Sequence, residues 1–378
     1  MTIKDRFPQS LLSQSSTARL TYFQNKVVAH PLLKQTHRAL LDAIRQPAGA
    51  SLIFVVGPTG VGKTTLRLRL ERQLLEEEQV TMEQDPGYLP VAGLEVAAPE
   101  AGNFRWKDYY QRALIALDEP LIEHKLDYSV NNLRRDGNGN LLFGKQVIVS
   151  ELRWALEQAL RHRRLLAFIV DEAQHFSKIA GGRRLLDQMD TLKSLANLTN
   201  TVHVLVGTYE VLSLVNLSAQ LNRRSIEIHF PRYHLDNPEE RTAFRSILLT
   251  FQRHLPLRQE PDLVGWEEYY YEHSVGCVGV LKNWLTRALA AALEDGQKTL
   301  THTLLERCAL PPRRLLRLAR ELKDGEASLL ESGATSTELR ILLGLPSEAS
   351  TARQGRPSQQ VGQRRPIRDP VGRETHGN

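Results

Sequence analysis

Residues 51–65 read Ser-Leu-Ile-Phe-Val-Val-Gly-Pro-Thr-Gly-Val-Gly-Lys-Thr-Thr. The first part, 51–56, is an apolar run of strand length, as expected for a strand covered on both faces. A glycine-rich stretch follows at once, and the sequence from Thr64 onward (TTLRLRLERQLLEEE) has the apolar spacing of an amphipathic helix. Strand, glycine-rich turn and helix in this order predict a phosphate-binding loop, the P-loop, at the end of a buried strand.

The residue types of this loop suit a nucleoside triphosphate. Its glycines let backbone N–H groups turn toward phosphate oxygens, and the helix N-terminus adds partial positive charge. Lys63 is expected to reach the β and γ phosphates, and the Thr64 hydroxyl to ligate magnesium. The predicted ligands are therefore a nucleoside triphosphate and Mg²⁺. The residues predicted to contact the nucleotide are Gly57, Pro58, Thr59, Gly60, Val61, Gly62, Lys63, Thr64 and Thr65.

A magnesium-dependent site also needs an acidic residue at the end of a neighbouring strand. Asp118-Glu119 and Asp171-Glu172 both follow apolar residues. The apolar side chains before the first pair fall on one helical face, which predicts a helix there, whereas 165–170 (LLAFIV) predicts a buried strand. We therefore assign Asp171 to magnesium and Glu172 to orienting or polarising the attacking water, so that hydrolysis is expected.

Two further positions are predicted to complete the site. Thr208 follows a strand predicted at 202–206, where its hydroxyl is placed to hydrogen-bond the γ phosphate or the water; a plain strand-ending turn is the alternative. Arg223 and Arg224 precede an alternating strand at 225–230. Because hydrolysis needs positive charge at the transition state, one of them is a candidate finger toward a neighbouring subunit's nucleotide. A solvated surface pair is the other interpretation.

The chain from 238 to 345 has one helical pattern after another. The segment Gly-Cys-Val-Gly-Val-Leu-Lys, 276–282, opens one of these helices, and Lys282 is predicted to touch the same phosphates. Arg287 is the substitute for that role.

Strands alternating with helices, followed by an all-helical region, predict an α/β fold with a central parallel sheet flanked by helices, then a smaller helical lid. Residues 17–47 read as helical throughout, and glycines and prolines break the pattern from 85 to 99. The segment 136–140 is expected to be a turn between short strands or a flexible tip. The expected parts are an N-terminal helical segment (1–48), the α/β core (49–235), the helical lid (236–345) and a disordered basic tail (346–378).

Composition places bounds on cellular context. The net charge of +6 and the pI near 9.3 favour polyanionic partners, and arginines at 353, 356, 364, 365, 368 and 373 concentrate charge in the tail. No apolar run reaches the length of a membrane span, so no membrane partner is expected. The two cysteines, Cys277 and Cys308, are expected to be packed thiols. A cytoplasmic protein is predicted.

The order of motifs resembles that of an AAA+ ATPase. The P-loop is followed by DEAQH (171–175), VGTYE (206–210), LNRRSIEI (221–228) and GCVGVLK. The N-terminal helix leading through Ala-His-Pro at 29–31, and YYQRALIALDEPL at 109–121, resemble more narrowly the TnsC/TniB group. Members of that group are ATPase regulators of transposition in bacterial Tns-type and CRISPR-associated transposons. The resemblance extends over roughly residues 15 to 330.

This resemblance implies ATP-dependent assembly into rings or helical filaments, a homo-oligomer around double-stranded DNA. It also implies contacts with a transposase and with a target-selection protein of the TniQ or TnsD type, and disassembly on hydrolysis. DNA-contact residues do not transfer by motif. Charge suggests two sets, with an exposed charged face as the alternative for each: Lys178, Arg183 and Arg184, or Arg105 and Lys107 beside Trp106.

Two other functions share these features. An AAA+ DNA-loading or replication-initiator ATPase would have the same core, and usually carries a winged-helix reader at its end. A nucleotide switch in signalling would bind protein partners and no DNA.

Overall fold

The computed structural model describes residues 6–98, 104–118, 133–135, 141–143, 149–177, 182–215, 224–329 and 333–345. The chain separates into two compact units, Met1–Glu326 and Ala327–Asn378, and the sheet and candidate site belong to the first. The basic tail predicted from 346 lies outside the described residues, as do Glu119, Lys178 and Arg223.

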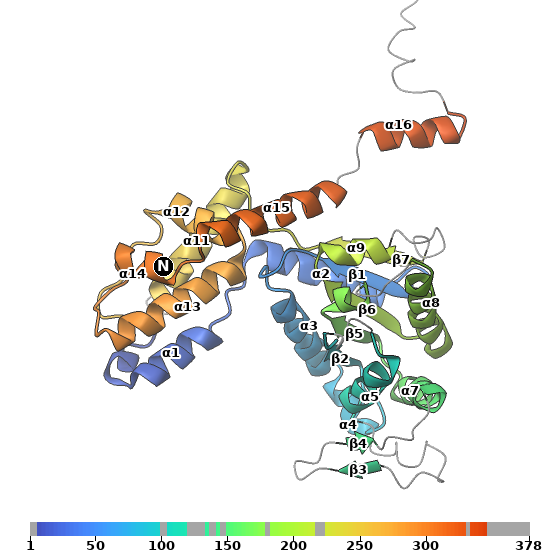
Figure 1. Cartoon of the computed structure of the whole chain (residues 1–378). Helices are drawn as coiled ribbons and strands as arrows, with labels where there is room; N and C mark the ends of the chain where they lie inside the picture. The colour runs from blue at the N-terminus through green and yellow to red at the C-terminus, as the bar shows by residue number, and fades with distance from the viewer. Residues whose placement is uncertain are drawn as a thin grey trace, which may run out of the picture. The chain divides into compact units, whose positions relative to one another are not determined.

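A five-stranded parallel sheet forms the centre of the first unit (Figure 1). Its order is β2-β5-β6-β1-β7, and every neighbouring pair is parallel. The strands are β1 (Leu52–Val56), β2 (Val91–Glu95), β5 (Ala167–Asp171), β6 (Val202–Gly207) and β7 (Ser225–His229). Because β1 ends in register with β6 and β7, and β2 with β5, the carboxyl ends of all five strands meet at one edge. The predicted α/β fold is confirmed.

Helices cover both faces of this sheet. Every residue of β1 is buried, and Ile53 and Val55 pack with leucines of α2 (Pro31–Arg45) and α3 (Lys63–Glu77). Phe54 alternates to the opposite face, where α7 (Val149–Arg163) and α8 (Gly182–Thr199) lie (Figure 1). Each such buried side chain stabilises the fold by about 1.5–3 kcal/mol. The packing therefore fixes the position at which β1 delivers the P-loop.

The N-terminal helical segment is two helices rather than one. α1 runs from Ser16 to Asn25 and α2 from Pro31, with extended residues between them. Pro31 has no N–H to continue a helix and restricts the preceding residue, so His30 adopts an extended conformation (φ −91°, ψ 161°) and caps α2. The prediction of continuous helix over 17–47 was wrong at this junction.

The sequence did not predict the edge strand β2, because prolines and glycines interrupt the apolar pattern there. Gly93 lies inside it, opposite Ile169 of β5. A Cβ at Gly93 would overlap the carboxylate of Glu71 in α3. Glycine is therefore needed in this strand, because a helix side chain approaches the strand backbone there. Farther along, β3 (Leu133–Arg135) and β4 (Leu141–Phe143) pair antiparallel, and the turn predicted between them lies outside the described residues.

The region after β7 is helical, as predicted. Phe244, Phe251 and Trp284 are buried in its core, together with Phe23 of α1. Among the described residues, no helix is long and apolar enough to cross a membrane. The helices are α11 (Pro238–His254), α12 (Glu267–Ser274), α13 (Val278–Glu294), α14 (His302–Cys308), α15 (Pro312–Leu329) and α16 (Gly333–Leu342). Smaller helices in the first unit are α4 (Gln79–Gln84), α5 (Trp106–Ala116) and α9 (Leu212–Val215).

Because one histidine in β6 is fully buried, we expect the folded protein to lose stability in mild acid. His203 lies beside Phe168, and burial lowers the pKa of its imidazole from 6.5 to about 4. Between these two values the unfolded chain binds more protons, so stability present above pH 6.5 is lost as the pH falls toward 4. We expect His203→Leu to remove on the order of 3 kcal/mol of this pH-dependent loss.

Urea unfolding at pH 7.5 and pH 5 measures the part of this loss that lies above pH 5, about 2 kcal/mol. His302→Gln, at an exposed position of α14, controls for the loss of one imidazole from the chain. An unchanged dependence in His203→Leu would show that the imidazole at 203 does not titrate differently in the two states.

Candidate active site

The P-loop connects β1 to α3 at the carboxyl edge of the sheet. Gly60 and Gly62 have φ values of +79° and +115°, the left-handed region that glycine adopts without steric cost. A Cβ at Gly57 would overlap the carbonyl oxygen of Phe230, just after β7. The loop therefore needs glycines for two separate reasons, backbone conformation and close packing against the neighbouring strand.

Lys63 is a buried cation at the first position of α3. Its side chain is 7% exposed, and Nζ donates to the carbonyl oxygens of Gly57 (3.0 Å) and Pro58 (2.9 Å). Burial lowers the pKa of Lys63, while the charges of Glu172 and Asp171 act in the opposite direction. A desolvated ammonium at the N-terminus of a helix is an arrangement that favours an anionic ligand.

The magnesium ligands predicted from the sequence lie together. The Thr64 hydroxyl donates to Asp171 Oδ2 at 3.0 Å, and Asp171 is 1% exposed at the end of β5. No group of three or more His, Cys, Asp or Glu side chains that could hold a metal ion occurs in the described part of the chain. Mg²⁺ is commonly held by one or two protein oxygens plus phosphates and water. The hydroxyl–carboxylate pair therefore fits a nucleotide-bound magnesium ion.

Sequence reasoning missed Arg67, one turn along α3 from Lys63. Its guanidinium NH1 lies 3.9 Å from Asp171 Oδ2, and its Nε donates to Glu71 at 2.8 Å. Both Arg67 and Glu71 are largely buried. Their four-residue spacing on one helical face was the available signal, but such pairs are common on solvated helices and do not by themselves indicate a site.

Glu172 stands in an unusual backbone conformation. Its φ is +56°, which costs a non-glycine residue about 1–2 kcal/mol. Two hydrogen bonds hold it there: its N–H donates to Asp171 Oδ1 at 2.9 Å, and its carboxylate accepts from Gln174 Nε2. Strain of this kind at the end of a central strand is typical of a functional position.

Thr208 begins the turn after β6, at the same edge of the sheet as the P-loop. Its N–H donates to Gln174 Oε1 at 3.2 Å. Its hydroxyl oxygen is buried and has no hydrogen-bond partner among the described residues. Because buried hydroxyls are normally satisfied, this orphaned group fits a ligand oxygen or a water.

The helical region reaches the P-loop through the start of α13. Gly279 N–H donates to the Gly60 carbonyl at 2.7 Å, and a Cβ at Gly279 would lie only 2.5 Å from that oxygen. The side chain of Val280 also packs closely on the loop. A Cβ added at Gly60 would lie 2.7 Å from Val280 Cγ2. The two glycines thus allow direct backbone contact between loop and helix.

The structure does not bring Lys282 to the P-loop. Its Nζ donates to the Gln24 carbonyl of α1 at 2.7 Å. Val280 faces the loop, and two residues farther along a helix a side chain is rotated by about 200°, onto the opposite side. The substitute, Arg287, donates to the Cys308 carbonyl at 3.1 and 3.2 Å. Both cations expected at the phosphates are therefore held by other parts of the chain.

Arg224 lies at the edge of the sheet opposite its own P-loop. Its carbonyl accepts from Ser51 N–H at 3.0 Å, next to the start of β1, and the arginine is exposed. The strand from Leu52 to Val56 separates it from the loop by about 13 Å, at 3.3 Å per residue. This side chain therefore does not reach the P-loop of its own chain.

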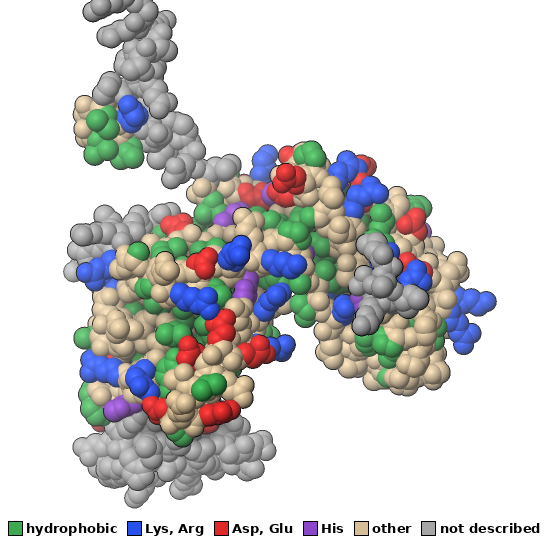
Figure 2. Space-filling view, turned by 180° about the vertical axis from the view of Figure 1, so that it is seen from behind, with side chains coloured by type: hydrophobic (Ala, Val, Ile, Leu, Met, Phe, Trp, Pro, Cys, Tyr) green, Lys and Arg blue, Asp and Glu red, His purple; other side chains and the backbone are tan. Residues whose placement is uncertain are grey.

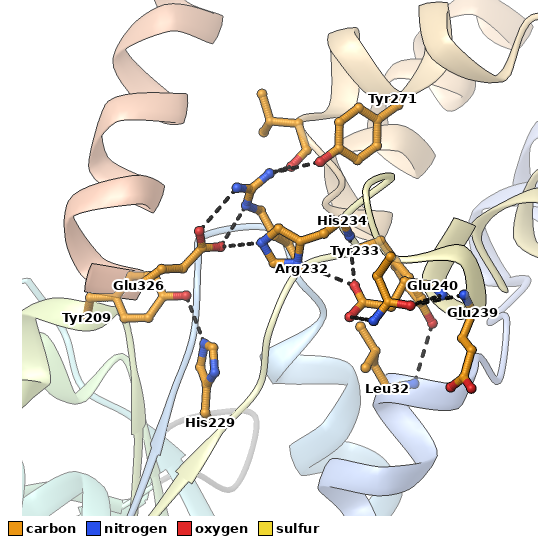
Figure 3. A network of polar contacts seen from close by, with 12 residues as sticks. Leu32, Tyr209, His229, Arg232, Tyr233, His234, Glu239, Glu240, Tyr271 and Glu326 are labelled. Atoms are coloured by element: carbon orange, nitrogen blue, oxygen red, sulfur yellow. Dashed lines mark hydrogen bonds and ion pairs between the residues drawn. The ribbon is translucent and has the colours of Figure 1, made fainter. Parts of the chain in front are cut away.

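A polar network connects the segment after β7 to α12 and α15 (Figure 3). Arg232 donates to Glu326 at 2.7 and 3.1 Å and to Tyr271 at 3.1 Å, and His234 lies 3.3 Å from the same carboxylate. Burial alone would raise the pKa of Glu326, but its bonds to Arg232 and His234 lower it. On the same helix, a Cβ at Gly325 would overlap the ring of Tyr209.

The basic candidates Arg105 and Lys107 lie near the segment that follows β5. Phe104 and Trp106, which flank exposed Arg105, pack on Phe176, with ring centroids 4.7 and 6.2 Å apart. Phe176 belongs to the 3-10 segment Ala173–Ser177 that directly follows Glu172. Arg105 and Lys107 therefore stand at a helix start that packs against the segment following Glu172.

For the other basic set, the structure describes no side chain. Lys178 lies outside the described residues, and Arg183 and Arg184 are described only as backbone of α8. On the face seen in Figure 2, Lys and Arg side chains are interspersed with Asp and Glu side chains. Charge on that face does not single out a DNA-binding patch.

Comparison with known proteins agrees with the geometry of the loop and sheet. Residues 45–215 match the family model described as AAA domain. No match was found among curated proteins. The fold resembles that of Aeropyrum pernix ORC1 solved in complex with DNA, at 18% identity and TM-score 0.50, covering 86% of this chain and 75% of that one.

Two further solved structures are similar at lower scores. The ADP form of Aeropyrum pernix ORC2 matches at 14% identity and TM-score 0.47, covering 76% of this chain and 71% of that one. A Walker-type ATPase of Pyrococcus abyssi matches at 16% identity and TM-score 0.43, covering 82% and 75%. Residues 45–215 are therefore similar to an AAA domain, and the fold resembles that of the ORC1 structure.

Proposed function

We propose that this chain is an ATP-hydrolysing regulator of DNA transposition. With ATP it assembles on double-stranded DNA, links a target-selection protein to a transposase, and leaves the DNA when ATP is hydrolysed. The ATPase part rests on the geometry of the site. The transposition part rests on the resemblance of the motif series to the TnsC/TniB group.

The observation that carries the ATPase activity is the pairing of Thr64 with Asp171 at 3.0 Å, beside buried Lys63. Lys63 and the loop N–H groups bind and orient the phosphates. Thr64 and Asp171 hold magnesium, which when bound neutralises charge that develops on the phosphates. Glu172 orients the attacking water and accepts its proton, and the Thr208 hydroxyl supplies a further hydrogen bond at the same edge.

The position of Arg224 supports function as an oligomer. In this proposal, the arginine at the sheet edge remote from its own P-loop completes the site of a neighbouring subunit. Arg223, the other candidate finger, precedes it in the chain. In this proposal each nucleotide lies between two subunits, so ATP binding and assembly depend on each other.

Three observations support DNA as the polyanion. The chain is basic, with a pI near 9.3. The similar ORC1 structure was solved with DNA bound. Arg105 and Lys107 stand on the helix start that packs on Phe176, directly after Glu172, so a change at the nucleotide has a short packed route to these cations. We propose Arg105 and Lys107 as DNA contacts, with Lys178, Arg183 and Arg184 as the second set.

An initiator-type or DNA-loading ATPase is the second candidate and fits the fold about equally well. Its ATPase site would be the same. The two functions differ in partners: the transposition regulator binds a transposase in an ATP-dependent way, whereas the initiator prefers origin DNA and engages replication proteins. A signalling switch would show no DNA dependence at all.

Assembly on DNA is the decisive measurement. With ATP and magnesium, electron microscopy should show large assemblies on duplex DNA that are absent with ADP. Their affinity should fall steeply between 50 and 200 mM salt, because phosphate contacts release counterions. Assemblies that form equally well without DNA would contradict the proposal.

A matched set of α5 variants tests the contact residues. The double variant Arg105→Ala and Lys107→Ala should weaken DNA binding about equally for all sequences and reduce the salt slope by roughly two. Arg112→Ala on the same helix, whose side chain is paired with Asp108 at 2.8 Å, serves as the control. Equal loss in both variants would show a general charge effect.

A further inference from the structure

Gln174 lies between the two groups that the proposed ATPase reaction places around the attacking water. Its side-chain amide nitrogen donates to the Glu172 carboxylate, and its amide oxygen accepts from Thr208 N–H at 3.2 Å. The two contacted residues follow different strands, β5 and β6. A single planar amide therefore connects the ends of both strands.

The surroundings hold this amide in one orientation. Gln174 is 7% exposed. The Ser177 hydroxyl donates to the backbone carbonyl of Gln174 at 2.6 Å, a bond within the 3-10 turn that does not involve the side-chain amide. A Cβ at Gly207 would lie 2.6 Å from the Gln174 amide oxygen, so glycine at the end of β6 leaves the space that the side chain occupies. Turning the amide over would set its nitrogen against the Thr208 N–H and its oxygen against the carboxylate, which replaces two hydrogen bonds by two repulsions.

Glu172 needs such support more than an ordinary carboxylate does. Its left-handed backbone, at φ +56°, directs the side chain away from the path of the strand. A long side chain with free rotamers would spend much of its time out of reach of the water. A hydrogen bond to a buried, immobilised amide restricts it to one orientation, as preorganised catalytic groups require.

We propose that Gln174 is a positioning residue, which holds the Glu172 carboxylate toward the water and couples its orientation to the backbone at Thr208. This rests on the proposed ATPase function of the same site. Gln174 acts through Glu172 and does not itself touch the reacting atoms. A movement of Thr208, for example on contact with the γ phosphate, would be transmitted through the amide to the carboxylate.

Two substitutions separate positioning from folding. Gln174→Met keeps the length and volume of the side chain but has neither the donor nor the acceptor. We expect kcat for ATP hydrolysis to fall about 10- to 100-fold, with KM and the affinity for a fluorescent ATP analogue changed less than about 3-fold. Ser177→Ala is the control, because it removes a hydrogen bond from the same segment without touching Glu172; its kcat should stay within about 2-fold of wild type.

Gln174→Glu adds a readout that a purely structural role would not change. This side chain can still accept from Thr208 N–H, but it places a second carboxylate beside Glu172. Because like charges disfavour ionisation, the acid limb of the kcat–pH profile should move to higher pH, whereas in Gln174→Met it should not. Thermal unfolding of each variant shows whether the fold is kept, and Gln174→Glu provides the test if Gln174→Met does not fold.

The outcomes are distinguishable. If wild-type protein hydrolyses ATP and both Gln174 variants keep its kcat and pH profile, the inference is overturned while the ATPase function stands. If Ser177→Ala loses activity to the same extent as Gln174→Met, the segment matters only as a unit and the specific role of Gln174 is overturned. If wild-type protein binds no ATP, the proposed function fails and the inference with it.

Discussion

Replacing Lys63 by alanine is expected to lower the affinity for ATP at least about 100-fold. Lys63 is the buried cation at the loop, proposed to bond the β and γ phosphates. Each hydrogen bond from a charged group contributes about 1.5–3 kcal/mol, so the loss of these two bonds to ATP accounts for the factor. The fold should tolerate the change, because burial of the ammonium is itself unfavourable, as the lowered pKa of Lys63 indicates. Titration calorimetry or a fluorescent ATP analogue measures the affinity directly, and assembly on DNA should be lost in parallel.

Lys282→Ala is the matched control for that experiment. This lysine was also predicted to touch the phosphates, but it donates to the Gln24 carbonyl on the far side of α13. Its removal should change ATP affinity less than about 3-fold, as for most exposed polar contacts. If both variants lose affinity equally, α13 rotates when nucleotide binds and the sequence-based role of Lys282 is right.

Changing Glu172 to glutamine is expected to slow hydrolysis about 100- to 10,000-fold while ATP binding is kept. A carboxylate that orients the water and takes its proton accelerates hydrolysis by about this factor. An amide of the same shape cannot accept the proton. Protein that binds but does not hydrolyse ATP should remain assembled on DNA. Phosphate release and electron microscopy of the same sample measure both effects.

Glu119→Gln tests the competing assignment. The pair Asp118-Glu119 was the other candidate for the acidic position, and the structure places Asp118 just after helix α5 rather than at the end of a strand. We expect wild-type turnover in Glu119→Gln. Normal turnover in Glu172→Gln, with loss in Glu119→Gln, would reverse the assignment.

Local patterns were sufficient for much of this site. The P-loop combines a buried strand, glycines and a helix start within fifteen residues, 51–65, so each part is determined by its near neighbours. The choice of 165–170 as a strand also depended on local pattern, and β5 with Asp171 at its end confirms it. The strand β2 was missed because Gly93 looks like a breaker until Glu71 of α3 is known to fill the space above it.

The sequence alone determined the strand–loop–helix unit and the acidic pair, because hydrophobic periodicity and glycine content act over a few residues. Only the tertiary structure decided which distant groups meet at the edge of the sheet. Parallel register brings Thr208 to Asp171 through the order of β5 and β6. Helix rotation directs Val280 to the loop and Lys282 away from it, and Arg224 is left at the opposite edge. These positions follow from packing between segments far apart in the chain, which no local pattern contains.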